Sequence, residues 1–600
     1  MSSRVFAVAV AFGILAALGC ADTNADSANP ADAASPDGKD EVALTGGKAD
    51  EMFGGCRADK VLDLVNDPAI GAADLEDEGL HSRAAGNIIE ARNGADGQAG
   101  TDDDVLFETL VQIDDVYYVG PVAMEQLASM VDGLCLEAWT GETEVIFSPQ
   151  PYEDSHLVRV AELIDEADTS VDIAMYSMSD SRIMDALERA EQRGIEVRMI
   201  FEPARDERDE GAGTTSAELE DIGVDVRYIN KIMHHKYALI DGPREVLDES
   251  SDDAAAAPGI LVTGSANWSH SAGTRYDENT VITAGNPELN MRFQREFNHL
   301  WAHSRDYDIG AGHDFFETDT VDESSIPDDP AVDAVFTSDN FRTYYSDRYG
   351  ETFSVRRGLD TVADEIVRHI EGAQDSIWVA SGHLRSRPIS EALLAKAAQN
   401  PDMDIKVYLD GQEYVSEWAH DSEVDDRQDC LDEAGDSEAR RQDCLDKSYH
   451  YSFDVDRADN IELRFKFYAY RWHYTYAEQM HHKYMIIDGD TVLSGSYNYS
   501  DNAEHNTMEN LVVYTGEAAS GLVADYESNF VEIWETGQGK YDDLMAEVQS
   551  GDSFPIVFDS MALSWQQVSD LKSAIYANCP DVNSYDFRRY PQSHTMCYLD

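Results

Sequence analysis

Short apolar runs alternate with longer segments of helical pattern over most of the chain. A helical pattern runs into an apolar strand at residues 164–174 and again at 370–380, and a further helical segment and strand follow each, ending at residues 193–201 and 404–409. This alternation predicts an α/β sandwich with mostly parallel central strands. Because the two stretches resemble each other, we expect two homologous halves packed about a pseudo-twofold axis.

A short buried strand recurs in both halves with the same polar residues around it. Residues 233–241 read MHHKYALID and residues 480–488 read MHHKYMIID, so both contain the pattern HxKxxxxD. Residues i and i+2 of a strand share a face, so the histidine and the lysine of each motif point the same way. A Gly-Ser-x-Asn turn follows each motif, and a Glu-Asn pair follows each turn at the same spacing. The two sets are His234, Lys236, Asp241, Ser265, Asn267 and Glu278, and His481, Lys483, Asp488, Ser496, Asn498 and Glu509.

These residue types suit the cleavage of a phosphodiester without a metal or another cofactor. A neutral imidazole can displace an alcohol from phosphorus and form a covalent phospho-histidine, and a second histidine can protonate the leaving alkoxide. The lysines, serines and asparagines would hold the non-bridging oxygens as charge builds on them. Each glutamate fits the role of accepting the far ring N–H of a histidine and fixing its tautomer.

With these motifs the chain resembles the phospholipase D superfamily, in which two HxKxxxxD motifs from homologous halves meet at one active site. The resemblance covers roughly residues 143–540 and is specific because both complete sets are present. It implies His234 as the nucleophile and His481 as the general acid, with Asp241 and Asp488 as structural or electrostatic supports.

The same resemblance leaves several activities open. The favoured one is hydrolysis of phospholipids to phosphatidate and free headgroup, with transfer to other alcohols as a further option. A metal-independent secreted nuclease of the superfamily is the first alternative, and a surface binding protein that keeps the fold without turnover is the second.

Charge favours a lipid over a nucleic acid as the partner. The chain has 118 Asp and Glu against 44 Lys and Arg, a formal net charge of −74. Proteins that bind nucleic acids in general show a basic footprint, which this composition lacks. An aromatic and basic stretch at residues 464–476 suits a lipid headgroup boundary or stacking on bases. We expect a phospholipid substrate at a membrane surface, and a monomer.

The start of the chain has the pattern of an export signal. Arg4 precedes the apolar run 5–18, which is short for a membrane span, and the run ends just before Cys20. The segment is similar to a bacterial lipoprotein cleavage site, which implies a signal peptide at residues 1–19, lipidation of Cys20 and a cell-envelope location. Simple secretion is the alternative. Residues 20–52 have the composition of a disordered tether.

The remaining boundaries follow from composition shifts. We expect a small helical domain at residues 53–138, the first half at 140–320, the second half at 321–540 and a C-terminal extension at 541–600. Residues 114–123 resemble the turn of a helix-hairpin-helix, although acidic flanks favour a structural or interaction module over DNA binding.

Six cysteines remain in an exported chain once Cys20 is set aside, so three disulfides are expected. One of these disulfides would close an insertion in the second half. This insertion could act as a lid over the site or be a surface loop without such a role. Proximity in the sequence suggests the pairs Cys56–Cys135, Cys430–Cys444 and Cys579–Cys597, and other pairings stay open.

Overall fold

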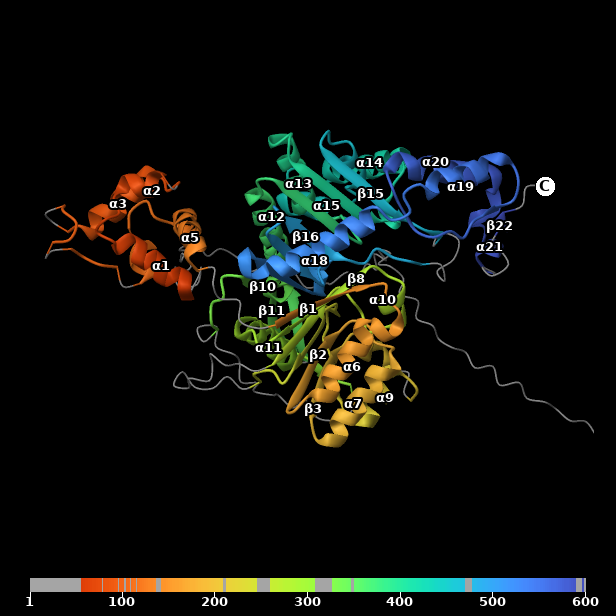
Figure 1. The fold of residues 1–600 in the computed structure, drawn as a ribbon, viewed down its shortest axis with the longest axis horizontal. Helices are drawn as coiled ribbons and strands as arrows, with labels where there is room; N and C mark the ends of the chain where they lie inside the picture. Colours follow the sequence, from red (N-terminus) through yellow and green to blue (C-terminus); the bar gives the residue numbers. More distant parts are fainter. Residues whose placement is uncertain are drawn as a thin grey trace, which may run out of the picture. The chain divides into compact units, whose positions relative to one another are not determined.

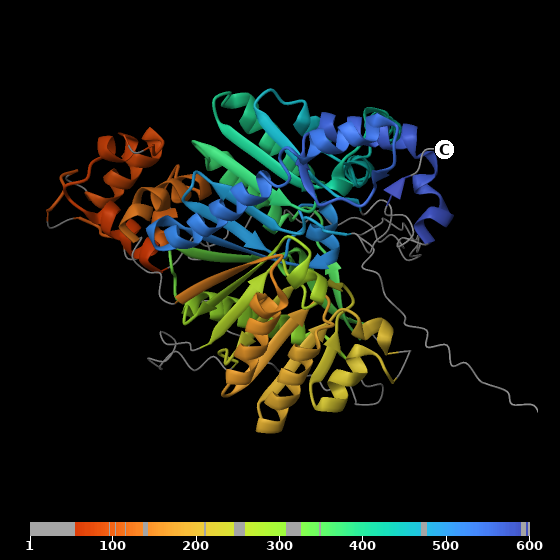
Figure 2. The same ribbon diagram turned by 45° about the vertical axis from the view of Figure 1, so that its right-hand side comes forward.

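The computed structural model describes most of the chain. The described residues are 55–135, 142–244, 259–307, 326–469, 477–589 and 596–597, apart from 78, 95–96, 102–103, 108, 115, 209–211 and 347–349. Within them lie two mixed sheets of eight strands each, with helices packed on both (Figures 1 and 2). The predicted pair of α/β halves is therefore confirmed.

The first half builds its sheet in the order β1-β8-β7-β6-β2-β3-β4-β9. Helices α6, α7 and α9 cover one face of it, where they lie side by side in Figure 1. The strands are β1 (Glu142–Ser148), β2 (Ser170–Met175), β3 (Glu196–Phe201), β4 (Asp225–Tyr228), β6 (Lys236–Ile240), β7 (Ile260–Gly264), β8 (Glu278–Ala284) and β9 (Arg305–Asp306). The helices are α6 (His156–Glu166), α7 (Ser181–Arg193), α8 (Ala204–Glu207), α9 (Thr215–Ile222), α10 (His270–Thr274) and α11 (Pro287–Ala302).

The second half repeats this order with β10-β19-β17-β16-β13-β14-β15-β21. Its strands are β10 (Val332–Phe336), β13 (Ser376–Ser381), β14 (Asp404–Asp410), β15 (Ile461–Phe467), β16 (Lys483–Ile487), β17 (Thr491–Gly495), β19 (Asn510–Thr515) and β21 (Met561–Leu563). Its helices are α12 (Thr361–Gly372), α13 (Arg387–Gln399), α14 (Glu417–Ala434), α15 (Glu438–Leu445), α16 (Ser452–Asp456), α17 (Asp501–Asn506) and α18 (Gly516–Trp534). A separate hairpin joins β11 (Phe341–Ser346) and β12 (Gly350–Val355).

The expectation of mostly parallel strands was wrong. Within the two eight-stranded sheets, only β2-β3-β4 and β13-β14-β15 run parallel, because helices cross over between those strands. The strands of β6-β7-β8 and of its repeat β16-β17-β19 follow one another within their sheet and pair antiparallel. Each motif strand, β6 or β16, pairs antiparallel with β2 or β13 at the centre of its sheet.

One apolar core is shared by the two halves. It contains Tyr237 and Phe293 from the first half together with Tyr484 and Phe530 from the second, all of them buried. Helix α18 of the second half contacts β1 of the first half. The halves are thus packed as one body around a common core, and this fixes the positions of the motif strands.

The chain before the halves folds into short helices with a core of their own. These helices are α1 (Gly55–Asn66), α2 (Ala72–Asp77), α3 (Ser82–Arg92), α4 (Leu110–Asp114) and α5 (Pro121–Cys135). The buried Arg92 donates to the backbone oxygens of Val65, Asp67 and Ile70, which holds the loop after α1 against α3.

The predicted C-terminal extension continues the second half. It contributes α19 (Lys540–Ser550), the edge strand β21 and α20 (Trp565–Asn578), whose apolar side chains join the core of that half. It ends with α21 (Tyr585–Arg589) and a two-stranded ribbon of β20 (Phe554–Pro555) and β22 (Met596–Cys597).

The expected cysteine pairs can be followed in part. The Sγ atoms of Cys430 and Cys444 lie 2.00 Å apart between α14 and α15, and those of Cys579 and Cys597 lie 2.08 Å apart. The side chains of Cys56 and Cys135 lie outside those that the structure describes, as does Cys20. The stapled insertion follows the carboxyl end of β14, and its role as a lid stays a prediction.

Candidate active site

Backbone pairing between the halves brings the two motif histidines to one place. Strand β5 (Ile232–Met233) pairs parallel with β18 (Thr507–Met508), and the backbone N–H of His234 donates to the oxygen of Met508 at 3.2 Å. On the other side of the pseudo-twofold axis, the N–H of His481 donates to the oxygen of Asp277 at 2.9 Å. Each histidine is therefore tied to the residue that precedes the glutamate of the opposite half.

The glutamates contact the histidines across the halves. Nδ1 of His234 lies 2.7 Å from Oε1 of Glu509, and Nδ1 of His481 lies 2.8 Å from Oε1 of Glu278. His481 and Glu278 form a hydrogen bond, whereas Nδ1 of the His234 ring is not aligned well enough with Glu509 to form one. Because a glutamate oxygen faces Nδ1 of both rings, Nε2 is the nitrogen that each ring leaves for a substrate.

The motif lysines stand beside these rings. Nζ of Lys236 donates to the backbone oxygen of His234 at 2.6 Å, and Nζ of Lys483 donates to that of His481 at 2.7 Å. Both lysine side chains are buried, and Lys236 also lies over the ring of Tyr176. Two ammonium groups held in this way place positive charge where the oxygens of a phosphodiester would bind.

The Gly-Ser-x-Asn turns are tied to the neighbouring strand and offer amides. The hydroxyl oxygen of Ser265 accepts from the backbone N–H of Asn279, and that of Ser496 accepts from the backbone N–H of Asn510. Oδ1 of Asn267 and of Asn498 is buried without a hydrogen-bond partner among the described residues, so these amides are available to a ligand.

Glycine is required at the start of each turn. A Cβ placed at Gly264 would collide with the backbone oxygen of Asn279, and one at Gly495 would collide with that of Asn510. This close approach places Ser265 against β8, which begins with Glu278. It likewise places Ser496 against β19, which begins directly after Glu509.

Burial dominates the electrostatics of the site. Desolvation, together with the charges of the nearby lysines, lowers the pKa of His234 and of His481 well below the ordinary value. Desolvation raises the pKa of Glu278 and of Glu509 to about 7, and lowers the pKa of Lys483 to about 8. A neutral imidazole at His234, the form that a nucleophile needs, is therefore favoured at neutral pH, whereas His481 must take up a proton before it can act as an acid.

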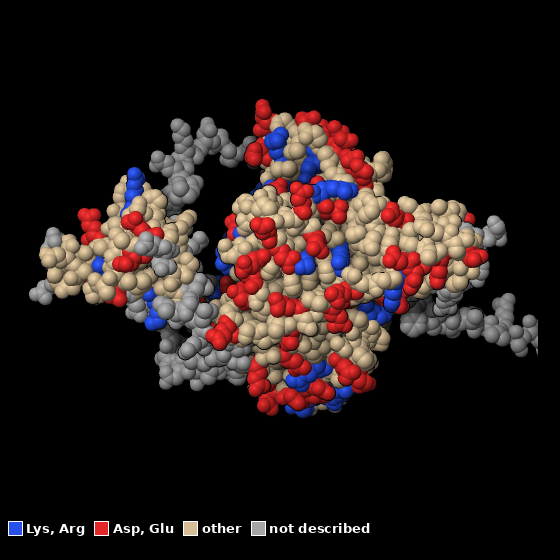
Figure 3. All heavy atoms as spheres, turned by 45° about the horizontal axis from the view of Figure 1, so that its top comes forward, with Lys and Arg blue, Asp and Glu red and all other residues tan. Residues whose placement is uncertain are grey.

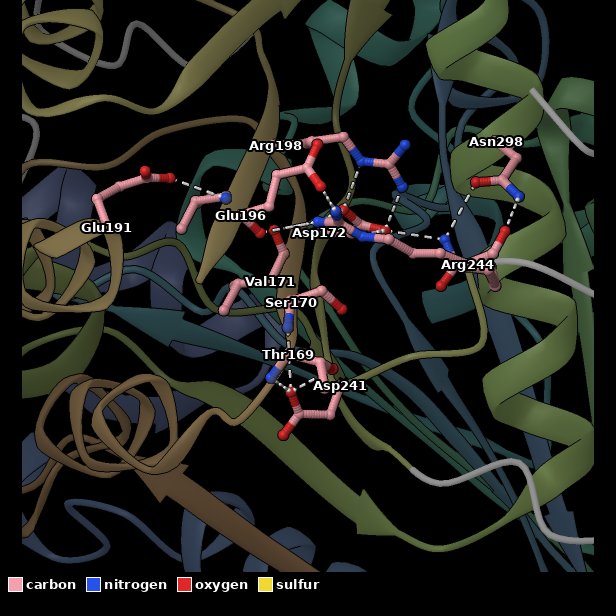
Figure 4. Close-up of polar contacts among 12 residues, drawn as sticks. Thr169, Ser170, Val171, Asp172, Glu191, Glu196, Arg198, Asp241, Arg244 and Asn298 are labelled. Carbon is pink, nitrogen blue, oxygen red and sulfur yellow. Dashed lines mark hydrogen bonds and ion pairs between the residues drawn. The ribbon is translucent and has the colours of Figure 1, made fainter. Parts of the chain in front are cut away.

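The motif aspartates do not join this group. Asp241 and Asp488 adopt positive φ angles of 55° and 52° where their strands end. The carboxylate of Asp241 accepts from the backbone N–H groups of residues 168–170, as Figure 4 shows for Thr169 and Ser170, and Asp488 accepts from those of residues 374–376. Burial alone would raise the pKa of Asp241, but these hydrogen bonds outweigh it and lower the pKa. Both aspartates anchor the far end of the motif strand.

A buried charge cluster braces the same strand in the first half. Asp172 on β2 accepts from Arg198 on β3 at 2.6 Å and from Arg244, beyond β6, at 2.5 Å (Figure 4). Asp172 is nearly inaccessible to solvent, and such a carboxylate needs its charge balanced. The cluster thus joins three neighbouring segments behind the site.

Two carboxylates that the sequence analysis missed position the motifs directly. Glu202 accepts from the backbone N–H of Met233 at 2.6 Å, and Asp410 accepts from that of Met480 at 2.9 Å. Glu202 directly follows β3, Asp410 is the last residue of the equivalent strand β14, and both contact the residue just before a motif histidine. An alignment of the two halves would have revealed the pair, because an acid stands at the same place in each.

The aromatic and basic stretch is mostly internal. Phe465, Phe467 and Tyr468 are buried in the core, and Arg464 donates to the backbone oxygen of Trp534. Lys466 forms a buried ion pair with Asp277 of the first half at 2.6 Å. This part of the stretch is therefore not an exposed platform for lipid or bases, and residues 470–476 lie outside the described residues.

Comparisons with known proteins agree with this geometry. The family model described as "Cardiolipin synthase, PLD-like domain" matches residues 160–301 and 366–534, more than half of the chain. The chain therefore belongs to the phospholipase D superfamily, and each half contributes one PLD-like domain.

Individual relatives cover smaller parts of the chain. Mitochondrial cardiolipin hydrolase of Drosophila melanogaster is 31% identical over 152 residues, which are 24% of this chain and 58% of that protein. The protein of the same name from Xenopus tropicalis is 28% identical over 184 residues, 30% of this chain and 76% of that protein. The chain thus spans little more than half of the first of these relatives.

Two solved structures are also similar. The phospholipase D family member Nuc from Salmonella typhimurium is 27% identical, with a TM-score of 0.22, and the match covers 28% of this chain and 99% of that one. Phosphatidylserine synthase from Haemophilus influenzae is 11% identical, with a TM-score of 0.43, over 77% of this chain and 97% of that one.

Proposed function

We propose that the protein is a phospholipase D-type phosphodiesterase that hydrolyses phospholipids to phosphatidate and free headgroup. The observation that carries this proposal is the pair of buried imidazoles, each with Nδ1 against a glutamate of the opposite half. Such a pair offers two Nε2 atoms to one phosphorus, one as nucleophile and one as acid.

In the proposed reaction, His481 first takes up a proton on Nε2, and Nε2 of His234 then attacks phosphorus while His481 gives that proton to the departing headgroup oxygen. The bond from phosphorus to that oxygen breaks as the bond to His234 forms, leaving a phosphatidyl-histidine. His481, now neutral, takes a proton from a water that attacks phosphorus and releases His234. Lys236 and Lys483 stabilise charge on the non-bridging oxygens throughout. Another alcohol in place of the water would give transfer.

Two features support a lipid substrate. The relatives named above include cardiolipin hydrolases, and the formal net charge of −74 opposes binding to polyanions in general. Acidic side chains are spread over both halves on the face seen in Figure 3, with fewer basic ones between them. The same charge argues against the nuclease alternative.

We further propose that the enzyme acts outside the cytoplasm, anchored to the cell envelope by a lipid on Cys20. Support comes from the sequence of residues 1–20 alone, which lie outside the described part of the chain. Among the described helices, none has the length and apolar character needed to cross a bilayer.

Activity assays separate the candidate functions. Purified protein is incubated with phosphatidylcholine, cardiolipin and plasmid DNA, each with and without EDTA, and His481→Ala serves as the inactive control. Release of headgroup and phosphatidate that persists in EDTA supports the proposal. Cleavage of DNA alone would establish the nuclease, binding without turnover would favour a surface binding protein, and activity abolished by EDTA would contradict the two-histidine mechanism.

A further inference from the structure

A third imidazole lies on the His481 side of the site and has no part in the mechanism above. In the pairing of β13 with β16, Ser381 stands opposite Lys483, and the N–H of Gly382 then donates to the oxygen of His482 at 3.1 Å. Continuing this register by one residue places His383 opposite His481. A quarter of the His383 side chain is exposed, so the ring lies at the accessible edge of the site.

A buried carboxylate orients the His383 ring. Nδ1 lies 2.9 Å from Oε1 of Glu413, which is fully buried, and the same carboxylate accepts from Nη2 of Arg385 at 2.9 Å and from its Nε at 3.1 Å. Burial would raise the pKa of Glu413, but the hydrogen bond from His383 and the charges of His383 and Arg385 lower it. With Nδ1 engaged, Nε2 of His383 is left to face outward, as in His481.

Charge around His383 favours an anion. One ionised carboxylate, Glu413, faces both an imidazole and a guanidinium, and Lys483 lies close by in the motif itself. Asp410 and Glu423 also lie near the cluster, but the oxygens of Asp410 already accept from Tyr468, Met480 and Gln412, and those of Glu423 are taken up by His450. His383 and Arg385 thus share one carboxylate, Glu413, at a partly exposed place on a strongly acidic protein.

The first half has no such group at the equivalent position. There, Met175 stands opposite Lys236, Tyr176 donates its N–H to His235 at 3.0 Å, and the next residue is Ser177. Instead, the ring of Tyr176 packs edge-on against His234, with the ring centroids 4.6 Å apart. The two sides of the site differ in chemistry, with an aromatic ring beside His234 and a polar ring beside His481.

We infer that His383, positioned by Glu413 and Arg385, binds a second anionic group on the leaving alcohol, so that the site prefers phosphodiesters whose leaving group carries a further phosphate. This inference rests on the proposed function, in which His481 stands on the leaving-group side of phosphorus. Since the Nδ1–H of His383 already goes to Glu413, the ring takes up a second proton on Nε2 as the phosphate binds and donates it in a charge-assisted hydrogen bond.

Kinetics of the variant His383→Gln test this role. The substrates are short-chain phosphatidylglycerol and the same lipid with its glycerol headgroup phosphorylated, and a dinucleotide with and without a terminal phosphate forms a parallel arm that distinguishes a nucleic-acid source. Loss of a charge-assisted hydrogen bond should lower kcat/KM for the phosphorylated lipid by about tenfold or more, chiefly through KM, and that for phosphatidylglycerol by less than about threefold.

The control is His369→Gln. His369 also pairs with a glutamate, Glu365, at 3.1 Å, but it lies in the last turn of α12, before β13 begins, whereas the site lies where β13 ends. Equal losses for both lipids in His383→Gln would mean that the residue acts only through His481, and no loss would mean that it does not touch the substrate. Either result would overturn the inference.

A binding experiment keeps the inference testable apart from turnover. Calorimetry compares glycerol 1,3-bisphosphate with glycerol 3-phosphate as ligands of the full chain. The wild type should bind the bisphosphate more tightly, and His383→Gln should lose that preference while His369→Gln keeps it. A preference that is absent from the wild type, or that survives in His383→Gln, would overturn the inference even if lipid hydrolysis were confirmed. Absence of lipid cleavage beside an intact His383-dependent preference would instead refute the proposed function.

Discussion

The ion pair between Asp277 and Lys466 should contribute strongly to the packing of the two halves. Nζ of Lys466 and Oδ1 of Asp277 lie 2.6 Å apart, and about 5% of each side chain is exposed. The free-energy cost of removing one partner should therefore be that of a buried ion pair, not the smaller cost for a surface pair. Substituting Lys466→Ile leaves Asp277 buried without its partner, which should cost about 3–5 kcal/mol of unfolding free energy. Because the backbone of Asp277 also holds His481, activity should fall with stability.

The repeat supplies a matched control for this experiment. The positions equivalent to Asp277 and Lys466 in the other half are Met508, which precedes Glu509, and Ile229, which follows β4. The double variant Asp277→Met with Lys466→Ile therefore copies a pair that the protein already packs. It should recover most of the loss, because apolar replacement of a buried ion pair is often neutral.

Denaturant unfolding, followed by tryptophan fluorescence, measures the wild type, the two single variants and the double variant. A coupling energy of several kcal/mol between the two positions is the expected result. A Lys466→Ile variant within about 1 kcal/mol of the wild type would refute the reasoning, since that is the value of an exposed pair.

Three further predictions follow from the site. His234→Ala and His481→Ala should each lower kcat by at least about a thousandfold, measured as headgroup release, because each removes one of two obligatory groups; near-normal turnover by either would contradict a shared site. Loss of a carboxylate destabilises the neighbouring imidazolium. Glu509→Gln should therefore move the acidic limb of the pH–rate profile, set by His234, to lower pH, and Glu278→Gln should move the alkaline limb, set by His481, to lower pH. Limbs that do not move would contradict the pairing of glutamates with histidines. Asp241→Asn should reduce stability by about 1–2 kcal/mol with little change in kcat, since backbone N–H groups lose a charged acceptor. The lowered pKa of Asp241 gives the wild type a stability that is present above the unfolded-state pKa and is lost as pH falls through the folded-state pKa. Thermal unfolding of Asp241→Asn should therefore be less sensitive than the wild type to acidification, and equal sensitivity would contradict the role of Asp241.

Much of the fold could be predicted because both halves show the same local pattern of apolar and polar residues. The strand that follows each motif lysine is an uninterrupted apolar run, and a run of that length that is buried on both faces can only sit at the centre of a sheet. Strand direction could not be read in the same way. The order β6-β7-β8 depends on which strands become neighbours, and local periodicity carries no information on that point.

The site was predicted as a set of residue types but not as a set of contacts. Spacing placed Glu278 and Glu509 downstream of the motifs, yet only the packing of the halves shows that each contacts the histidine of the other half. The serines were expected to hold substrate oxygens, and the structure adds that each hydroxyl accepts from a backbone N–H of the next strand, which the glycine before it lets approach closely. Long-range contacts of this kind arise from tertiary packing, which spacing along the chain does not encode.

The most direct test of the composite site is to trap the covalent intermediate. His481→Ala protein is mixed with a labelled phosphatidyl ester of p-nitrophenol, whose departure needs no general acid, and quenched within milliseconds to seconds, and peptide mass spectrometry then locates the phosphatidyl group. The proposed mechanism predicts an acid-labile adduct on His234 that builds up in His481→Ala and is absent from His234→Ala. An adduct on any residue other than His234, or turnover by the wild type with no adduct at all, would contradict it.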